Sequence, residues 1–153
     1  MNERGPGTSP ALGATLVVRR RIAASAAELF AAWTRPERLM LWWGPPGAVC
    51  SAAEVDLRVG GRYRLANRFA DGTVLWITGV FEAIEPPARL VYTWSLESRA
   101  GAAERVTVQF AATGDGATEV IVTHERIADE AARGGHERGW AGCLEGLARH
   151  AHG

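Results

Sequence analysis

Polar and apolar residues alternate along most of the middle of the chain, which is the period of a half-buried β-strand. The clearest case is residues 89–96, where Leu90, Tyr92, Trp94 and Leu96 share one face. Strand patterns also occupy residues 15–22, 49–58, 60–69, 73–84, 104–113 and 118–127. Short turn signals such as Asp71-Gly72 separate consecutive segments. Strands joined by tight turns predict an antiparallel sheet of seven strands.

Two short helices are predicted between the first and second strands. Ser25 and Glu28 have the spacing of a capping box, in which each side chain bonds the other residue's backbone. Pro36 ends the first helix and suits the first turn of a second one, over residues 36–43. On that helix Trp42 and Trp43 would point about 100° apart. We therefore expect that they do not share one pocket, and that one ring packs in the core while the other lines or gates a cavity.

A single long helix is predicted over residues 129–150. Apolar or aromatic side chains recur there at the helical period, at His136, Trp140, Cys143, Leu144 and Leu147. Five glycines weaken this helix, by about 1 kcal/mol each where exposed, so it depends on packing. A curved sheet wrapped around one helix touches it along one side only. The element order thus predicts an α+β fold with an internal cavity.

The expected organisation is one domain over residues 14–150. Residues 1–13 are rich in Gly, Pro and Ser and are expected to form a flexible tail, and residues 151–153 a short C-terminal tail. No apolar run approaches about 18 residues, so membrane insertion is not expected. Without a visible secretory signal, a cytoplasmic location is the default.

Composition narrows the chemistry further. Formal net charge is zero and no basic stripe is visible, so a nucleic-acid partner is not expected. All 17 basic residues are arginine, which excludes Schiff-base chemistry and a phosphate-loop lysine. Cys50 and Cys143 are far apart in the sequence and are expected to be buried free thiols. We expect neither a metal nor a cofactor.

Several segments together resemble the activator-of-Hsp90-ATPase-homologue branch of the START-like (SRPBCC) superfamily. They are WTRPERLMLWW (33–43), VDLRVGGRYR (55–64), PPARLVYTW (86–94), VTHER (122–126) and HERGWAGCLEGL (136–147). The resemblance spans about residues 14–150. It implies the helix-grip fold, a seven-stranded curved sheet around a long C-terminal helix, with a hydrophobic ligand cavity between them. The wider superfamily includes lipid and polyketide carriers, cyclases and subunits of hydroxylating enzymes.

Aromatic and histidine residues expected on the inner face are the candidate ligand-binding residues. They are Trp33, Trp42, Trp43, Tyr63, Trp76, Tyr92, Trp94, His124, His136 and Trp140. Each would equally serve as plain core, because one aromatic ring buries roughly 150–250 Å². The face of Trp76 stays open, since both faces of its strand carry apolar residues. His124 is either a core histidine bonded to a backbone or tyrosine partner, or a neutral imidazole facing the cavity.

Three functions remain open at this point. The first is a carrier or sequestering protein for a small hydrophobic, ring-containing ligand. The second is a cyclase-like or hydrolase-like enzyme that uses His124 or a pocket tyrosine as acid–base. The third is a chaperone activator or interaction module, as the resemblance suggests by name. An exposed sheet edge and many aromatic residues are also compatible with a homodimer.

Overall fold

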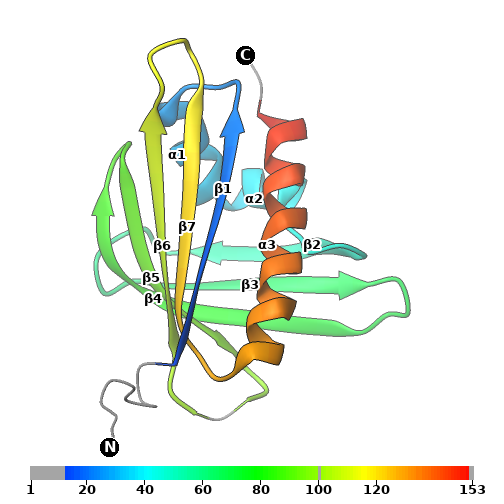
Figure 1. Cartoon of the computed structure of the whole chain (residues 1–153). Helices are drawn as coiled ribbons and strands as arrows, with labels where there is room; N and C mark the ends of the chain where they lie inside the picture. Colours follow the sequence, from blue (N-terminus) through cyan, green and yellow to red (C-terminus); the bar gives the residue numbers. More distant parts are fainter. Residues whose placement is uncertain (1–12, 100, 152–153) are drawn as a thin grey trace, which may run out of the picture.

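The strands form one antiparallel sheet of seven strands in the order β1-β7-β6-β5-β4-β3-β2. The computed structural model describes residues 13–99 and 101–151 (Figure 1). The strands are β1 (Ala14–Ile22), β2 (Ala48–Val55), β3 (Arg62–Phe69), β4 (Val74–Glu85), β5 (Arg89–Leu96), β6 (Glu104–Ala112) and β7 (Thr118–Ile127). The helices are α1 (Ala26–Thr34) and α2 (Pro36–Trp42), which lie between β1 and β2, and α3 (Glu130–His150). The predicted helix-grip fold is confirmed.

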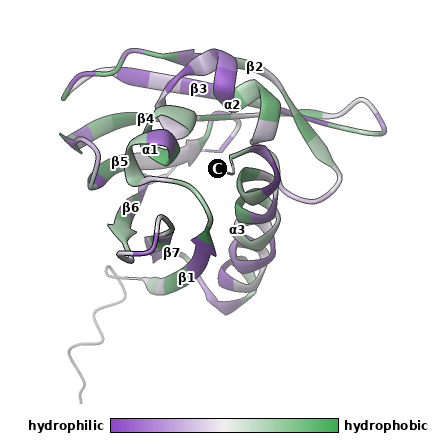
Figure 2. Ribbon diagram, turned by 90° about the horizontal axis from the view of Figure 1, so that it is seen from above, coloured by the Kyte–Doolittle hydropathy of each residue, from purple (hydrophilic) through white to green (hydrophobic). Residues whose placement is uncertain are grey.

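The sheet curves, and its inner side faces the three helices (Figure 2). Register shifts in the β1–β7, β2–β3 and β4–β5 pairings bend the strands. As a result β1 and β7 run beside α3, whereas β2 and β3 cross its direction (Figure 1). The core lies on this inner side, where Val106, Val108, Val120 and Val122 are fully buried.

The end of β2 differs most from the predicted strand bounds. The pattern predicted a strand up to residue 58, but β2 ends at Val55. The following residues turn back, because the Gly61 amide donates to the Arg58 carbonyl at 2.8 Å. Gly60 has a φ of +86° in this turn, a conformation that favours glycine. The apolar–polar alternation continued past the strand because this turn carries both kinds of residue.

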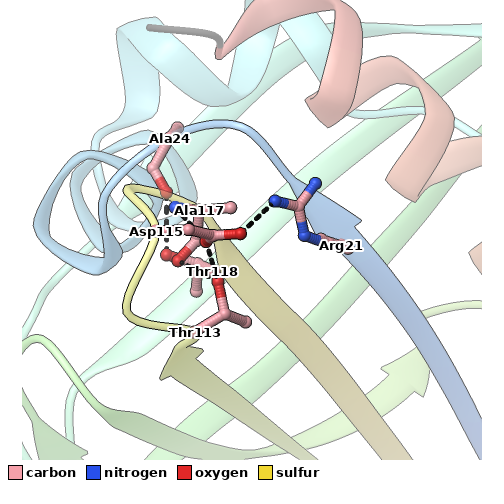
Figure 3. Close-up of polar contacts among 6 residues, drawn as sticks. All are labelled: Arg21, Ala24, Thr113, Asp115, Ala117 and Thr118. Carbon is pink, nitrogen blue, oxygen red and sulfur yellow. Dashed lines mark hydrogen bonds and ion pairs between the residues drawn. The ribbon is translucent and has the colours of Figure 1, made fainter.

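The turn between β6 and β7 ties three parts of the fold together (Figure 3). The Asp115 carboxylate accepts a hydrogen bond from the Thr113 hydroxyl and pairs with Arg21 of β1 at 2.5 Å. The Thr118 hydroxyl donates to the Ala24 carbonyl at 2.7 Å, just before α1. This end of the sheet is therefore held by side-chain contacts as well as by the backbone hydrogen bonds between strands.

Only one of the two hydrogen bonds of the predicted capping box is present at the start of α1. Ser25 accepts from the Glu28 amide at 3.1 Å, as the capping box predicts. The Glu28 carboxylate does not return to Ser25; it pairs with Arg38 of α2. That ion pair joins the two short helices.

Helix α3 begins after Asp129, whose side chain accepts from the Ala132 amide at 2.9 Å. It packs on β1, β7 and α2 and buries Trp140, Cys143, Leu144 and Leu147. The Gly44–Gly47 loop lies against the same helix. A Cβ on Gly142 would lie 2.5 Å from Cδ of Pro46, which is too close for two carbon atoms. Thus a glycine that weakens the helix also lets this loop dock on it.

The chain ends fall partly outside the described residues, as do residues 1–12 of the expected N-terminal tail. Ala151, assigned to the C-terminal tail, is buried, and its amide donates to the Leu147 carbonyl at 2.8 Å. The helices in residues 13–99 and 101–151 are all too short or too polar to span a membrane. Cys50 and Cys143 are buried free thiols, as predicted.

Candidate functional site

A cavity of about 210 Å³ lies between α3 and the inner face of β3, β4 and β5. It exists because α3 packs along β1 and β7 and α2 packs on β2, so that β3, β4 and β5 between them are covered less closely. The wall is made of aromatic and aliphatic side chains with few polar ones. It consists of Trp43, Pro45, Asn67, Phe69, Leu75, Ile77, Trp94, Leu96, Gly135, His136, Gly139, Trp140 and Cys143.

A second space lies between α1, α2 and the sheet and measures only about 20 Å³. That volume holds roughly one water molecule. Trp33, Tyr63 and Tyr92 line it. Their polar atoms are used internally: the Trp33 indole donates to the Tyr92 hydroxyl at 3.3 Å, and the Tyr63 hydroxyl donates to the Thr93 carbonyl at 2.7 Å. These three candidates therefore belong to packed core.

Trp42 and Trp43 lie side by side, contrary to the prediction. Both are buried, and their ring centroids are 5.5 Å apart. The helical angle does not apply, because α2 ends at Trp42 and Trp43 has the extended backbone of a C-cap, with φ −69° and ψ 138°. Trp42 donates its indole N–H to the Ala32 carbonyl at 2.9 Å, inside the core. Trp43 is the one that lines both the large and the small cavity.

Trp76 lies on the outer face of the sheet and not in the cavity. The buried positions of β4 are Ile77, Gly79 and Phe81, so alternation turns Trp76 outward. Its ring lies under the guanidinium of Arg64, 4.0 Å from the ring centroid. Periodicity alone could not show this, because both faces of β4 carry apolar side chains.

Trp94, His136 and Trp140 do lie at the large cavity. His136 sits over the Trp94 ring in an edge-to-face arrangement, with centroids 4.8 Å apart. His124 lies directly behind them and has no exposed surface. It borders neither of these two cavities, so its predicted direct contact with a ligand is not supported by its position.

A chain of hydrogen bonds connects His124 to the cavity wall. The Trp140 indole N–H donates to Nδ1 of His124 at 2.9 Å. Because an indole can only donate, Nδ1 must accept, and the proton of the neutral ring is on Nε2. Nε2 then donates to Oε1 of Glu104 at 2.6 Å. Nε2 of His136 contacts the same oxygen at 3.1 Å. The partners of His124 are thus an indole and a carboxylate, and not the expected backbone or tyrosine.

Burial and hydrogen bonding set the charge of this chain. Burial raises the pKa of Glu104, but the hydrogen bonds from His124 and His136 outweigh it and bring the pKa to about 2. Burial is the main cause that lowers the pKa of His124, and the bond to Glu104 offsets only part of it. Near neutral pH the cluster therefore holds a carboxylate beside a neutral His124.

Glu104, His124 and His136 offer three potential metal ligands whose donor atoms lie within 4.8 Å of one another. The tautomer of His124 opposes such a site. A metal on Nε2 needs that lone pair, so the proton would move to Nδ1, where the Trp140 N–H already points. Two donors would then face each other. The arrangement fits a hydrogen-bond relay better than a metal centre.

Two buried polar atoms have no hydrogen-bond partner among the described residues: Nε1 of Trp43 and Oδ1 of Asn67. Both residues line the large cavity. An unpaired buried donor or acceptor costs about 1–3 kcal/mol. Such atoms call for an explanation by water or ligand.

Sequence reasoning missed Glu104 and Asn67, although alternation could have found both. Asn67 follows the inward-facing Tyr63 and Leu65 at a spacing of two, and Glu104 precedes Val106 in the same way. A polar residue in the apolar register of a strand is the signal that points to a site.

Comparisons with known proteins agree with this architecture. The model of a family described as activator of Hsp90 ATPase homolog 1-like protein matches residues 23–152. A crystal structure of a Chromobacterium violaceum protein is 27% identical, with TM-score 0.81 over 91% of this chain and 97% of its own. The AHSA1 protein from Silicibacter pomeroyi is 27% identical, with TM-score 0.78 over 89% and 96% of the two chains.

An AHSA1-like protein from Aeromonas hydrophila, solved by NMR, is 25% identical, with TM-score 0.74 over 90% of this chain and 91% of its own. The search of curated proteins returned no match. The similarity therefore covers nearly the whole of each compared structure, including the sheet, the short helices and α3.

Proposed function

Since the chain belongs to the family of activator of Hsp90 ATPase homolog 1-like proteins, whose fold commonly binds hydrophobic ligands, we propose that it binds a small, ring-containing hydrophobic molecule as a carrier or sequestering protein. The observation that carries this proposal is the cavity of about 210 Å³ between α3 and the sheet. Binding sites for small molecules are concave, mostly apolar and have a few polar groups. Three indole rings, of Trp43, Trp94 and Trp140, and one amide match that description.

The energetic argument is that the wall of this cavity gains contacts when a guest fills it. Apolar surface removed from water contributes about 25 cal/mol per Å². The wall is already positioned by the core, so little ordering free energy is lost on binding. Rings suit the site because Trp43 and Trp140 meet edge to face, with centroids 5.5 Å apart, and offer flat surfaces.

Isothermal titration of the purified protein with toluene, indole and naphthalene tests the proposal. We expect saturable binding to at least one of them, with a matching rise in melting temperature. Leu75→Trp replaces an aliphatic side chain of the wall with an indole ring that fills the cavity, and it should abolish binding. The matched control is Val74→Trp, which adds the same ring at an exposed position of the same strand. Equal binding by both variants would mean that the ligand sits elsewhere.

A second candidate function, acid–base catalysis on the bound molecule, is favoured by one observation. His136 lines the cavity, and its Nε2 is held by the buried carboxylate of Glu104. A histidine oriented by a carboxylate is a common acid–base arrangement. His124 and the tyrosines are less suited, because His124 is fully buried and the tyrosine hydroxyls are used in the core. Burial also raises the pKa of Tyr63 and of Tyr92.

Mass spectrometry of a ligand after incubation with the protein tests catalysis. Conversion by the wild type that disappears in His136→Gln, with binding retained, would support it. An unchanged ligand would refute catalysis on that molecule.

Two further proposals follow from the family and from the cysteines. Activation of an Hsp90-type chaperone has the family name as its support, and a pull-down that enriches no chaperone would refute it. We also propose a cytoplasmic location, which the unpaired thiols of Cys50 and Cys143 support. A homodimer stays a prediction that light scattering would check.

A further inference from the structure

Asn67 stands out among the sheet residues that border the cavity. Its neighbours in the ladder are Cys50 of β2 and Leu75 of β4, neither of which can hydrogen-bond its amide well. The residue is 4% exposed, and its Oδ1 has no partner among the described residues. The other sheet residues of the wall are aliphatic or aromatic. A carboxamide in that position weakens the apolar wall unless a bound molecule pairs with it.

The kind of partner follows from hydrogen-bond chemistry. A carboxamide presents an acceptor oxygen and a donor nitrogen, and rotation by 180° exchanges them. A hydroxyl group both donates and accepts, so it pairs with the amide in either orientation. The second unpaired atom of this wall, Nε1 of Trp43, is a donor and needs an acceptor. A hydroxyl group can donate to Oδ1 of Asn67, and its oxygen is also an acceptor of the kind that Nε1 of Trp43 lacks.

The size of the partner follows from the cavity volume. A dry protein cavity of about 150 Å³ accommodates benzene. The cavity beside α3 measures about 210 Å³, which suits one ring with a small substituent or a compact fused pair. Sterols, long acyl chains and multi-ring polyketides would extend out of it, since sites that bury drug-sized ligands span about 300–1,000 Å³.

From these observations, and resting on the proposed function, we infer that the cavity selects a small hydroxylated aromatic molecule, of the size of a phenol, whose hydroxyl group pairs with the Asn67 side chain. Asn67 is then the residue that determines specificity, and the indoles supply the apolar contact. Recognition of a hydroxyl by a buried amide discriminates well against an analogue that lacks it, because the amide is left unpaired when that analogue binds.

Phenol and toluene test this inference, since they have the same number of heavy atoms and differ in one hydroxyl. Dissociation constants of both are measured by titration for the wild type and for Asn67→Leu, which has the same number and branching of side-chain heavy atoms and no amide. The quantity of interest is the toluene-to-phenol ratio of dissociation constants. Comparing the two proteins cancels the different hydration of the two probes. We expect the ratio to fall at least tenfold in Asn67→Leu, mainly through weaker phenol binding.

Leu96→Met is the control, because it changes the cavity wall on β5, two strands away from Asn67, and should leave the ratio within about twofold. If neither probe binds the wild type, the proposed function itself fails for this cavity. If both bind and the ratio is the same in Asn67→Leu, apolar binding stands and the inference about the hydroxyl is overturned.

A measurement on the wild type covers the case in which Asn67→Leu does not fold. The side-chain amide signals of Asn67 are followed by NMR while each probe is added. We expect them to shift with phenol and to change much less with toluene. Equal shifts with the two probes would overturn the inference.

Discussion

Trp140 holds His124 in a single tautomer, because its indole N–H donates to Nδ1 of the imidazole at 2.9 Å. The proton on Nε2 is then directed at Glu104, 2.6 Å away. This relationship makes His124 a neutral, fully buried donor between an aromatic helix residue and a carboxylate. It also separates two histidines that look alike in sequence, since His136 lines the cavity and His124 does not.

The titration of His124 should make the stability of the protein depend on pH. Its pKa is lowered in the folded protein, so below about pH 6.5 the unfolded chain takes up a proton that the folded one does not. Stability should therefore fall as the pH drops from 7 to 5, by up to about 1.4 kcal/mol per pH unit from this group. Glu104 contributes at lower pH, because its stabilising effect is lost between about 4.5 and about 2.

His124→Gln isolates that effect. The glutamine carbonyl can accept from Trp140 and its amide can donate to Glu104, but it does not titrate. Urea unfolding at pH 7, 6 and 5 should give a flatter profile for the variant than for the wild type. Parallel profiles would show that folding does not lower the pKa of His124, contrary to a buried neutral imidazole.

Zinc should not stabilise the wild type. The Trp140 donor keeps the lone pair of His124 on Nδ1, away from Glu104 and His136. Trp140→Phe removes that donor and frees the ring to ligate through Nε2. We expect Zn²⁺ to raise the melting temperature of Trp140→Phe by several degrees and to leave the wild type unchanged. Adding Glu104→Gln to the variant should cancel the rise, and a rise in the wild type would contradict the tautomer argument.

Two glycines of α3 should respond to alanine in opposite ways. Gly142→Ala puts a Cβ 2.5 Å from Pro46, so the Gly44–Gly47 loop must move, at a cost of about 1–3 kcal/mol. Gly135 has nothing within 4 Å of the same position, and Gly135→Ala should gain up to about 1 kcal/mol of helix propensity. Urea denaturation measures both. The same sign for both variants would mean that the loop does not rest on α3.

The adjacent tryptophans should also differ. Trp42→Phe loses the hydrogen bond to the Ala32 carbonyl and leaves that acceptor unpaired, whereas the Trp43 indole N–H has no partner to lose. Trp42→Phe should therefore destabilise the protein by about 1 kcal/mol more than Trp43→Phe does. For ligand binding, Trp43 should matter more than Trp42. The change in tryptophan fluorescence caused by an indole-free ligand such as toluene should weaken in Trp43→Phe and persist in Trp42→Phe.

The sequence was informative where the signals are local. Alternation and turn residues gave the seven strands and their order along the chain, and Ser25 and Pro36 marked the short helices correctly. The relation between Trp42 and Trp43 was predicted wrongly, because it depends on whether a helix ends one residue earlier. Trp76 could not be assigned to a face, since β4 is apolar on both.

The candidate site was less predictable, because it depends on contacts between distant segments. Glu104, His124 and His136 come from β6, β7 and α3 and meet only after folding. The volume of the cavity depends on side-chain packing, which periodicity does not describe. Alternation can, however, locate a buried polar residue, and it would have found both Asn67 and Glu104.

Helix α3 packs against β1 and β7 at one side of the sheet. The strands that face the cavity therefore bury less of their surface against this helix. Substitutions on β3 and β4 that reshape the wall should therefore be tolerated more readily than substitutions under α3 at β1 and β7. Such a division lets one scaffold acquire new guests by exchanging a few wall residues while its foldability is preserved. If the cavity binds small aromatic compounds as proposed, substitutions at its wall are the place to change which compound is bound.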